Sequence, residues 1–69
     1  MNRTTLENQA NRIGYTLTEA SRQTQMEAIS AGEPAPKWEV YATNFPHRDT
    51  VRGFTTLAKA KLWLDCRSA

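Results

Sequence analysis

Three side chains have the chemistry that catalysis or metal binding could use. They are His47, Asp49 and Cys66, and the chain has no other histidine or cysteine. A structural zinc site usually takes four ligands, so the sequence predicts no metal and no cofactor. Cys66 ends an apolar helical face without the electropositive surroundings that activate a thiol, and we expect it to be buried as a small apolar side chain. His47 and Asp49 fall in a polar loop, so we expect a protein that is not an enzyme.

The length and the single cysteine limit what the chain can be. Its 69 residues suffice for one domain, 1–69, with a small core. One cysteine allows no internal disulfide and favours a reducing, cytoplasmic location. No stretch reaches the roughly 18 apolar residues that a membrane span requires, so we expect no membrane partner. Small chains without disulfides or metals often self-associate, and we therefore predict a homodimer.

The positive charge is concentrated in the second half of the sequence. Residues 1–32 balance three arginines against three glutamates, whereas residues 37–69 carry six basic and three acidic residues. The basic residues could contact phosphates around a hairpin and a final helix. An alternative function is therefore a small DNA-binding regulator that uses Lys37, Tyr41, Arg48, Arg52, Lys59 and Lys61. In an extended strand, Arg52 would lie on the same face as Glu39 and Tyr41, where Glu39 would repel a phosphate backbone.

Residues 37–66 also resemble a known DNA-binding family. Trp38-x-Val40, followed by Phe54-x-Thr56-x-x-x-Ala60-x-x-Trp63-Leu64, is similar to the end of the AP2-like, arm-type DNA-binding domains of tyrosine recombinases. The resemblance implies a strand, a hairpin and a helix, with Phe54 and Trp63 in the core and a sheet face that reads DNA. The basic first strand of that family has no counterpart here, since Pro34-Ala35-Pro36 and a neutral segment stand in its place.

The N-terminal half predicts one long helix over residues 4–31, capped by Thr4 or Thr5. At about 100° per residue, seven small or apolar side chains fall in one stripe: Leu6, Ala10, Ile13, Leu17, Ala20, Thr24 and Ala28. Gly14 disfavours a helix, and a break there is the alternative, but the stripe keeps its phase across it. Tyr15, Met26 and Ile29 form a second apolar group on the far side, which a dimer mate or a partner would cover.

The second half predicts a compact strand–strand–helix unit after a hinge at 32–36. Residues 38–43 alternate as a strand, residues 50–54 return as a second one, and Thr55 or Thr56 caps a final helix. Ala60 and Leu64 belong to one face of that helix, while Leu62 belongs to another. The expected fold is therefore α+β, with a long helix, a two-stranded antiparallel hairpin and a C-terminal helix.

Together these features favour a small adaptor or inhibitor that binds a protein partner. Its size is typical of accessory proteins made by phages and mobile elements. The long and final helices would build the dimer, while exposed aromatic and arginine residues, which are enriched at binding hot spots, would contact the partner. The candidate residues are Tyr15, Arg22, Tyr41, Phe45, Arg48 and Arg52. Trp38, Phe54 and Trp63 are expected in the core.

Overall fold

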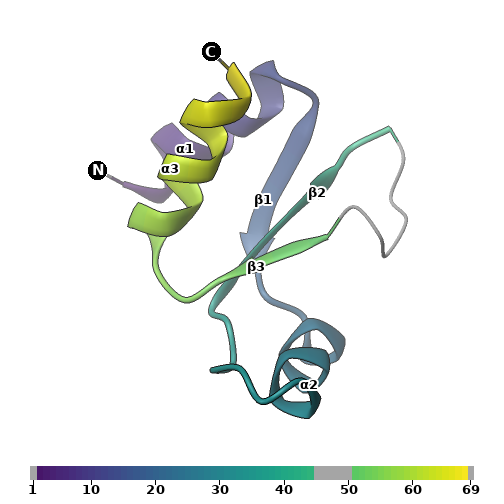
Figure 1. Cartoon of the computed structure of the whole chain (residues 1–69). Helices are drawn as coiled ribbons and strands as arrows, with labels where there is room; N and C mark the ends of the chain where they lie inside the picture. Colours follow the sequence, from purple (N-terminus) through teal and green to yellow (C-terminus); the bar gives the residue numbers. More distant parts are fainter. Residues whose placement is uncertain (1, 45–50, 69) are drawn as a thin grey trace.

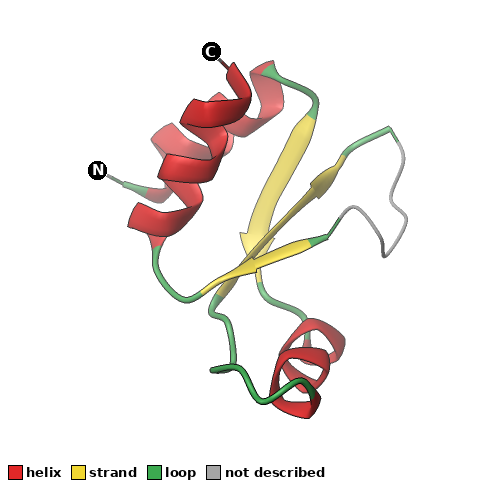
Figure 2. Ribbon diagram, viewed as in Figure 1, coloured by secondary structure: helices red, strands yellow, loops and turns green. Residues whose placement is uncertain are grey.

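The structure, a computed structural model, describes residues 2–44 and 51–68. Its fold is α+β, as the sequence predicts, with helices beside an antiparallel sheet (Figures 1 and 2). The elements, in chain order, are α1 (Arg3–Arg12), β1 (Tyr15–Glu19), α2 (Arg22–Ser30), β2 (Trp38–Ala42), β3 (Arg52–Phe54) and α3 (Leu57–Ser68). Within the described ranges, no helix has the length and apolar character needed to cross a membrane.

The prediction of one long N-terminal helix is wrong, because the chain leaves the helix at Gly14. This glycine has φ +85°, a left-handed conformation that glycine adopts without steric cost. The residues that follow, Tyr15–Glu19, form strand β1. Their alternation of Thr16 and Thr18 with larger side chains is a strand signal that the helical stripe obscured. The helix start is also displaced, since the Asn2 side chain caps α1 by accepting from Thr5 N at 2.8 Å.

Helix α2 is a separate element with its own start and end signals. Ser21 is its N-cap and accepts from Thr24 N at 3.2 Å. The helix ends before Gly32, whose φ of +79° and N–H bond to the Ile29 carbonyl complete a left-handed C-terminal turn. The helix therefore ends just before the predicted hinge at 32–36, although it is only nine residues long rather than part of a helix over 4–31.

The sheet has three strands in the order β1-β2-β3, so the predicted two-stranded hairpin is incomplete. Strands β2 and β3 do pair antiparallel as expected, with Trp38 opposite Phe54. The missed strand β1 pairs with the other edge of β2, with Leu17 opposite Val40. Because opposite residues share a face, the register sorts the strand residues into two sets. The apolar face carries Tyr15, Leu17, Glu19, Trp38, Val40, Ala42, Arg52 and Phe54, and the polar face carries Thr16, Thr18, Glu39, Tyr41 and Gly53.

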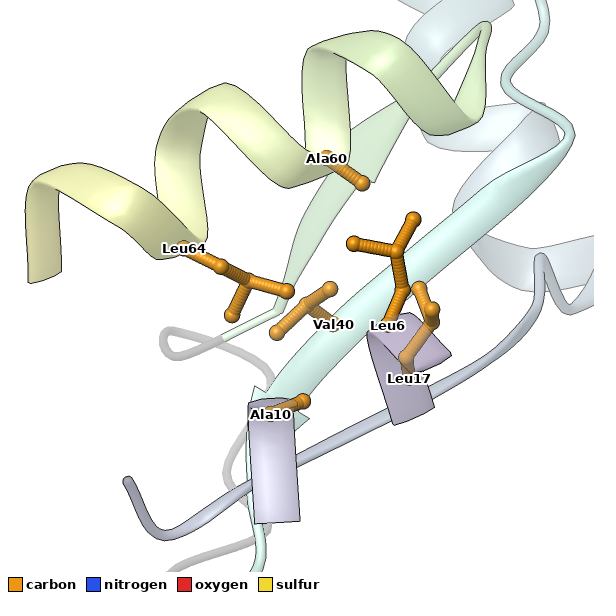
Figure 3. Packing of buried hydrophobic residues seen from close by; sticks show 6 residues of the cluster. All are labelled: Leu6, Ala10, Leu17, Val40, Ala60 and Leu64. Carbon is orange, nitrogen blue, oxygen red and sulfur yellow. The ribbon is translucent and has the colours of Figure 1, made fainter. Parts of the chain in front are cut away.

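Helices α1 and α3 cover the apolar face and form the core with it. The fully buried side chains come from both helices and from β1 and β2 (Figure 3): Leu6, Ala10, Leu17, Val40, Ala60 and Leu64. Trp38, Phe54 and Trp63 pack against this cluster, which confirms their predicted place in the core. The Arg3 side chain connects α1 to the sheet, because its guanidinium lies 5.2 Å from the centre of the Trp38 ring in β2 and 3.5 Å from Glu19 Oε1 in β1.

The final helix forms as the sequence predicts and is capped by Thr56. The Thr56 hydroxyl accepts from Lys59 N at 3.2 Å. Ala60 and Leu64 point into the core, whereas Leu62, on the opposite side, is 67% exposed. Cys66 is exposed rather than buried, so the prediction for this residue is wrong. Its position two residues after Leu64 turns it away from the sheet, toward the side occupied by Leu62.

Candidate binding surface

Helix α2 is attached to the polar face of the sheet through a buried carboxylate. Glu39 lies in β2 and is 6% exposed. Its Oε1 accepts from Ser21 N at 2.5 Å and from the Thr24 hydroxyl at 3.0 Å. A negative charge at a helix N-terminus is stabilised by the free N–H groups and by the helix dipole. Glu39 therefore fixes where α2 begins and which of its sides faces the sheet.

Further contacts define the inward side of α2. Gln25 donates from its side-chain amide to the Pro36 carbonyl at 3.0 Å. A methyl group built on Gly53 would lie 3.0 Å from Pro36 Cγ and 3.4 Å from Thr24 Cγ2, so Gly53 leaves the space into which Pro36 and Thr24 pack. The inward side of α2 is thus held mainly by polar and small residues.

The outward side of α2 carries Arg22, Met26 and Ile29. These residues are spaced by four and three positions, which places them along one side of a helix. Met26 is 53% and Ile29 54% exposed, and Arg22 is exposed as well. Figure 1 shows α2 at one end of the molecule, away from α1 and α3. We call Arg22, Met26 and Ile29 the α2 stripe.

Tyr15 does not belong to this surface, contrary to the sequence-based prediction. It lies in β1 on the apolar face and packs edge-on against Trp63, with ring centres 5.2 Å apart and planes at 82°. Such an edge-to-face arrangement is typical of aromatic core packing. The prediction placed Tyr15 with Met26 and Ile29 because it assumed one continuous helix. The break at Gly14 removes Tyr15 from that group and leaves the other two residues together.

The register also separates Tyr41 from Arg52. Tyr41 is half-buried on the polar face, while Arg52 lies opposite Val40 and so belongs to the apolar face. The prediction that Arg52 shares a face with Glu39 and Tyr41 is wrong. Strand β3 pairs with β2 in the register that places Gly53, rather than Arg52, opposite Glu39. Phe45 and Arg48 lie outside the described residues. Of the predicted contact residues that are described, Arg22 alone joins the α2 stripe.

The candidate DNA-contacting residues are distributed over different surroundings. Lys37 is exposed just before β2. Lys59 lines a pocket of ≈ 390 Å³ together with Glu27 and Glu33, whose carboxylates oppose phosphate binding. Lys61 is paired with Asp65 at 2.7 Å. Among the described strand residues, the polar face has no lysine or arginine, so the sheet does not present a basic reading surface.

The residues with catalytic chemistry are not assembled into a site in the described part of the chain. Cys66 is exposed near the end of α3, and His47 and Asp49 lie outside the described residues. Among residues 2–44 and 51–68 there is no group of three histidine, cysteine, aspartate or glutamate side chains that could hold a metal ion.

Met26 and Ile29 were absent from the predicted contact residues, although the sequence contained a signal for them. Their spacing placed them on the side of the predicted helix opposite the stripe of small and apolar side chains that runs from Leu6 to Ala28. The signal was assigned to the far side of one long helix, which a dimer mate or a partner would cover, whereas the structure exposes both residues on a short helix. No protein-family model, curated protein or solved structure matches this chain.

Proposed function

We propose that the chain is a non-enzymatic adaptor or inhibitor that binds a protein partner through the α2 stripe. The observation that carries the proposal is the exposure of Met26 and Ile29, 53% and 54%, next to Arg22. Arginine and methionine are enriched in the fully buried centres of protein interfaces. A single exposed apolar residue would need no explanation, but two adjacent ones beside an arginine form a continuous contact surface.

The attachment of α2 supports this assignment. Its inward side is held by hydrogen bonds from Ser21 and Thr24 to Glu39 rather than by apolar packing. Met26 and Ile29 therefore contribute little to the core and are available to a partner. An interface built on such residues releases water from about half of each side chain, which favours binding in proportion to the area covered.

The alternative, a DNA-binding regulator, finds less support in the geometry. Among its candidate residues, Tyr41 and Arg52 lie on opposite faces of the sheet, and Lys61 is paired with Asp65 at 2.7 Å. A DNA-binding surface gains affinity from several phosphate contacts made together. We therefore rank protein binding first and test both functions with the same material.

Capture from bacterial lysate with the immobilised chain tests the proposal. The wild-type chain is compared with Met26→Gln/Ile29→Gln, which removes the apolar surface and keeps good helix formers. We expect partners captured by the wild type to be lost with the double variant. With the identified partner purified, calorimetry should show affinity weakened about tenfold or more, the effect of removing binding hot spots.

Leu62→Gln is the matched control, since it changes another exposed apolar residue on another helix. Its affinity for the purified partner should stay within about twofold of wild type. If the double variant binds as tightly as wild type, the α2 stripe is not the binding surface. Anisotropy titration of a labelled mixed-sequence duplex at two salt concentrations tests the alternative, because tight binding that collapses with added salt would favour DNA as the target.

A further inference from the structure

Strand β3 is an edge of the sheet, and its outer side presents unpaired backbone groups. The strand order β1-β2-β3 gives β3 a neighbouring strand on one side only (Figure 1). Thr43 N donates to the Gly14 carbonyl at 2.9 Å, and because such bonds alternate along a strand, Glu39 also directs its backbone N–H and C=O toward β1. Gly53 stands opposite Glu39 in the other ladder, so its own N–H and C=O point away from β2, to the outer edge. Gly53 is exposed, and no described residue bonds these two groups.

A pocket of ≈ 390 Å³ lies along this edge. Gly53, Phe54 and Thr55 line it from β3 and the turn that follows. Glu27 contributes from α2, which lies on the polar face of the sheet, and Lys59 contributes from α3, which covers the apolar face. Because the lining residues come from elements on both faces, the pocket crosses the outer edge of β3 instead of lying on one face.

The two walls of the pocket carry opposite charges. The wall formed by α2 and the turn after it has the carboxylates of Glu27 and Glu33, whereas the wall formed by α3 has the ammonium group of Lys59. All three residues are exposed. Successive side chains of an extended strand point to opposite faces. A strand added at this edge would therefore direct alternate side chains toward the carboxylates and toward the lysine.

We infer that the outer edge of β3 binds an extended segment of a partner protein in which basic and acidic side chains alternate. Backbone bonds to Gly53 would add the segment to the sheet, and the two charged walls would select its sequence. A glycine within a strand is typical of places where a second backbone approaches closely. Ala28 and Pro34 also line the α2 wall and offer apolar surface to the stems of basic side chains.

This surface is distinct from the α2 stripe. Glu27 and Ala28 line the pocket from one side of α2, while Arg22, Met26 and Ile29 lie along another. The inference therefore does not rest on the proposed function, and each of the two surfaces is measured without the other.

A pair of labelled peptides tests the predicted selectivity. One is an octapeptide of alternating lysine and glutamate with blocked ends, and the other has the same composition with the lysines and the glutamates in separate blocks. Only the first can present one sign of charge to each wall when extended. Fluorescence anisotropy at low salt should show the alternating peptide binding about tenfold more tightly or better. Equal affinities, or no binding of the alternating peptide, would overturn the inference.

A charge reversal on the α2 wall tests the position of the site. Glu33→Lys alters an exposed residue outside the helices and should weaken binding of the alternating peptide about threefold or more. Glu19→Lys is the matched control, because it makes the same change in net charge at an exposed residue of β1, on the opposite edge of the sheet. The control should stay within about twofold of the wild-type affinity. Equal losses in the two variants would contradict a site at β3.

Hydrogen exchange at Gly53 tests the addition of a strand. With the alternating peptide at saturation, exchange of the Gly53 N–H should slow about tenfold or more, since a peptide carbonyl would accept its hydrogen bond. Amides of β1, at the opposite edge, should exchange at unchanged rates. A Gly53 amide that exchanges as fast with the bound peptide as without it would refute strand addition at this edge.

Discussion

The two faces of the sheet hold their helices by different means. On the apolar face, α1 and α3 are packed through fully buried leucine, valine and alanine side chains. On the polar face, α2 is held by the Glu39 carboxylate, which bonds Ser21 and Thr24. The first mode follows from the amount of apolar surface that is buried, whereas the second depends on a few directional bonds. The apolar face therefore sets most of the stability, and the polar face sets the position of the α2 stripe.

The largest expected effect comes from opening a cavity on the apolar side. Leu64→Ala should lower the free energy of unfolding by about 2–5 kcal/mol, because Leu64 is fully buried between α3 and the sheet. Leu62→Ala, two residues away on the exposed side of the same helix, should cost less than about 1 kcal/mol. Urea denaturation gives both values. Equal losses of unfolding free energy in the two variants would contradict the burial of Leu64 and the exposure of Leu62.

A smaller effect is expected from removing the buried carboxylate. Glu39→Ala leaves Ser21 N–H and the Thr24 hydroxyl without their acceptor, which should cost about 1–3 kcal/mol. Hydrogen exchange should show amides of α2 losing more protection than those of α1. Glu19→Ala is the control, because Glu19 is largely exposed and its ion pair with Arg3 spans 3.5 Å. Uniform loss of protection across all helices would contradict the local role of Glu39.

The smallest effect concerns the polar contact between α1 and α3. Bonds from Lys61 and Gln9 hold the pKa of Asp65 below its ordinary value of 3.8. A lowered pKa means that the folded chain favours the charged carboxylate, so its stabilising contribution is complete above about pH 3.8 and is lost as pH falls through the lowered pKa. NMR titration should give the lowered pKa directly, and Asp65→Asn should show a weaker loss of stability in acid. An Asp65 pKa at or above 3.8 would contradict the contact.

Hydrophobic patterning correctly predicted the helices and strands of the second half of the chain, but it predicted a helix in the first half where strand β1 forms. The hairpin and the final helix were predicted from alternation and from a threonine cap, and both form. In the first half, all members of the small-residue stripe from Leu6 to Ala28 do become buried or half-buried. They do so from three elements rather than one, because Gly14 ends α1 and Leu17 enters the core from a strand. A helical period therefore identified inward-facing residues while assigning the wrong backbone.

The candidate surface depended on that backbone assignment. Arg22 and Tyr15 were both predicted as contact residues. Arg22 lies in the α2 stripe, whereas Tyr15 packs against Trp63 on the apolar face of the sheet. Arg52 was expected on the face of Glu39 and Tyr41 but lies on the face of Val40. The register of β3 against β2 decides this, because a shift of one residue reverses the side on which every side chain lies. Neither the partner of Tyr15 nor the register of β3 is encoded in local spacing.

The sequence by itself determined the class of fold, the core aromatic residues Trp38, Phe54 and Trp63, and the two sides of α3, since these follow from local periodicity and capping. Tertiary structure decided that Tyr15–Glu19 becomes a strand, because pairing with β2 and burial of Leu17 outweigh the helical pattern. It also decided where α2 lies, because Glu39 comes from β2, beyond the turn that ends the helix. Contacts between residues distant in the sequence thus placed the α2 stripe.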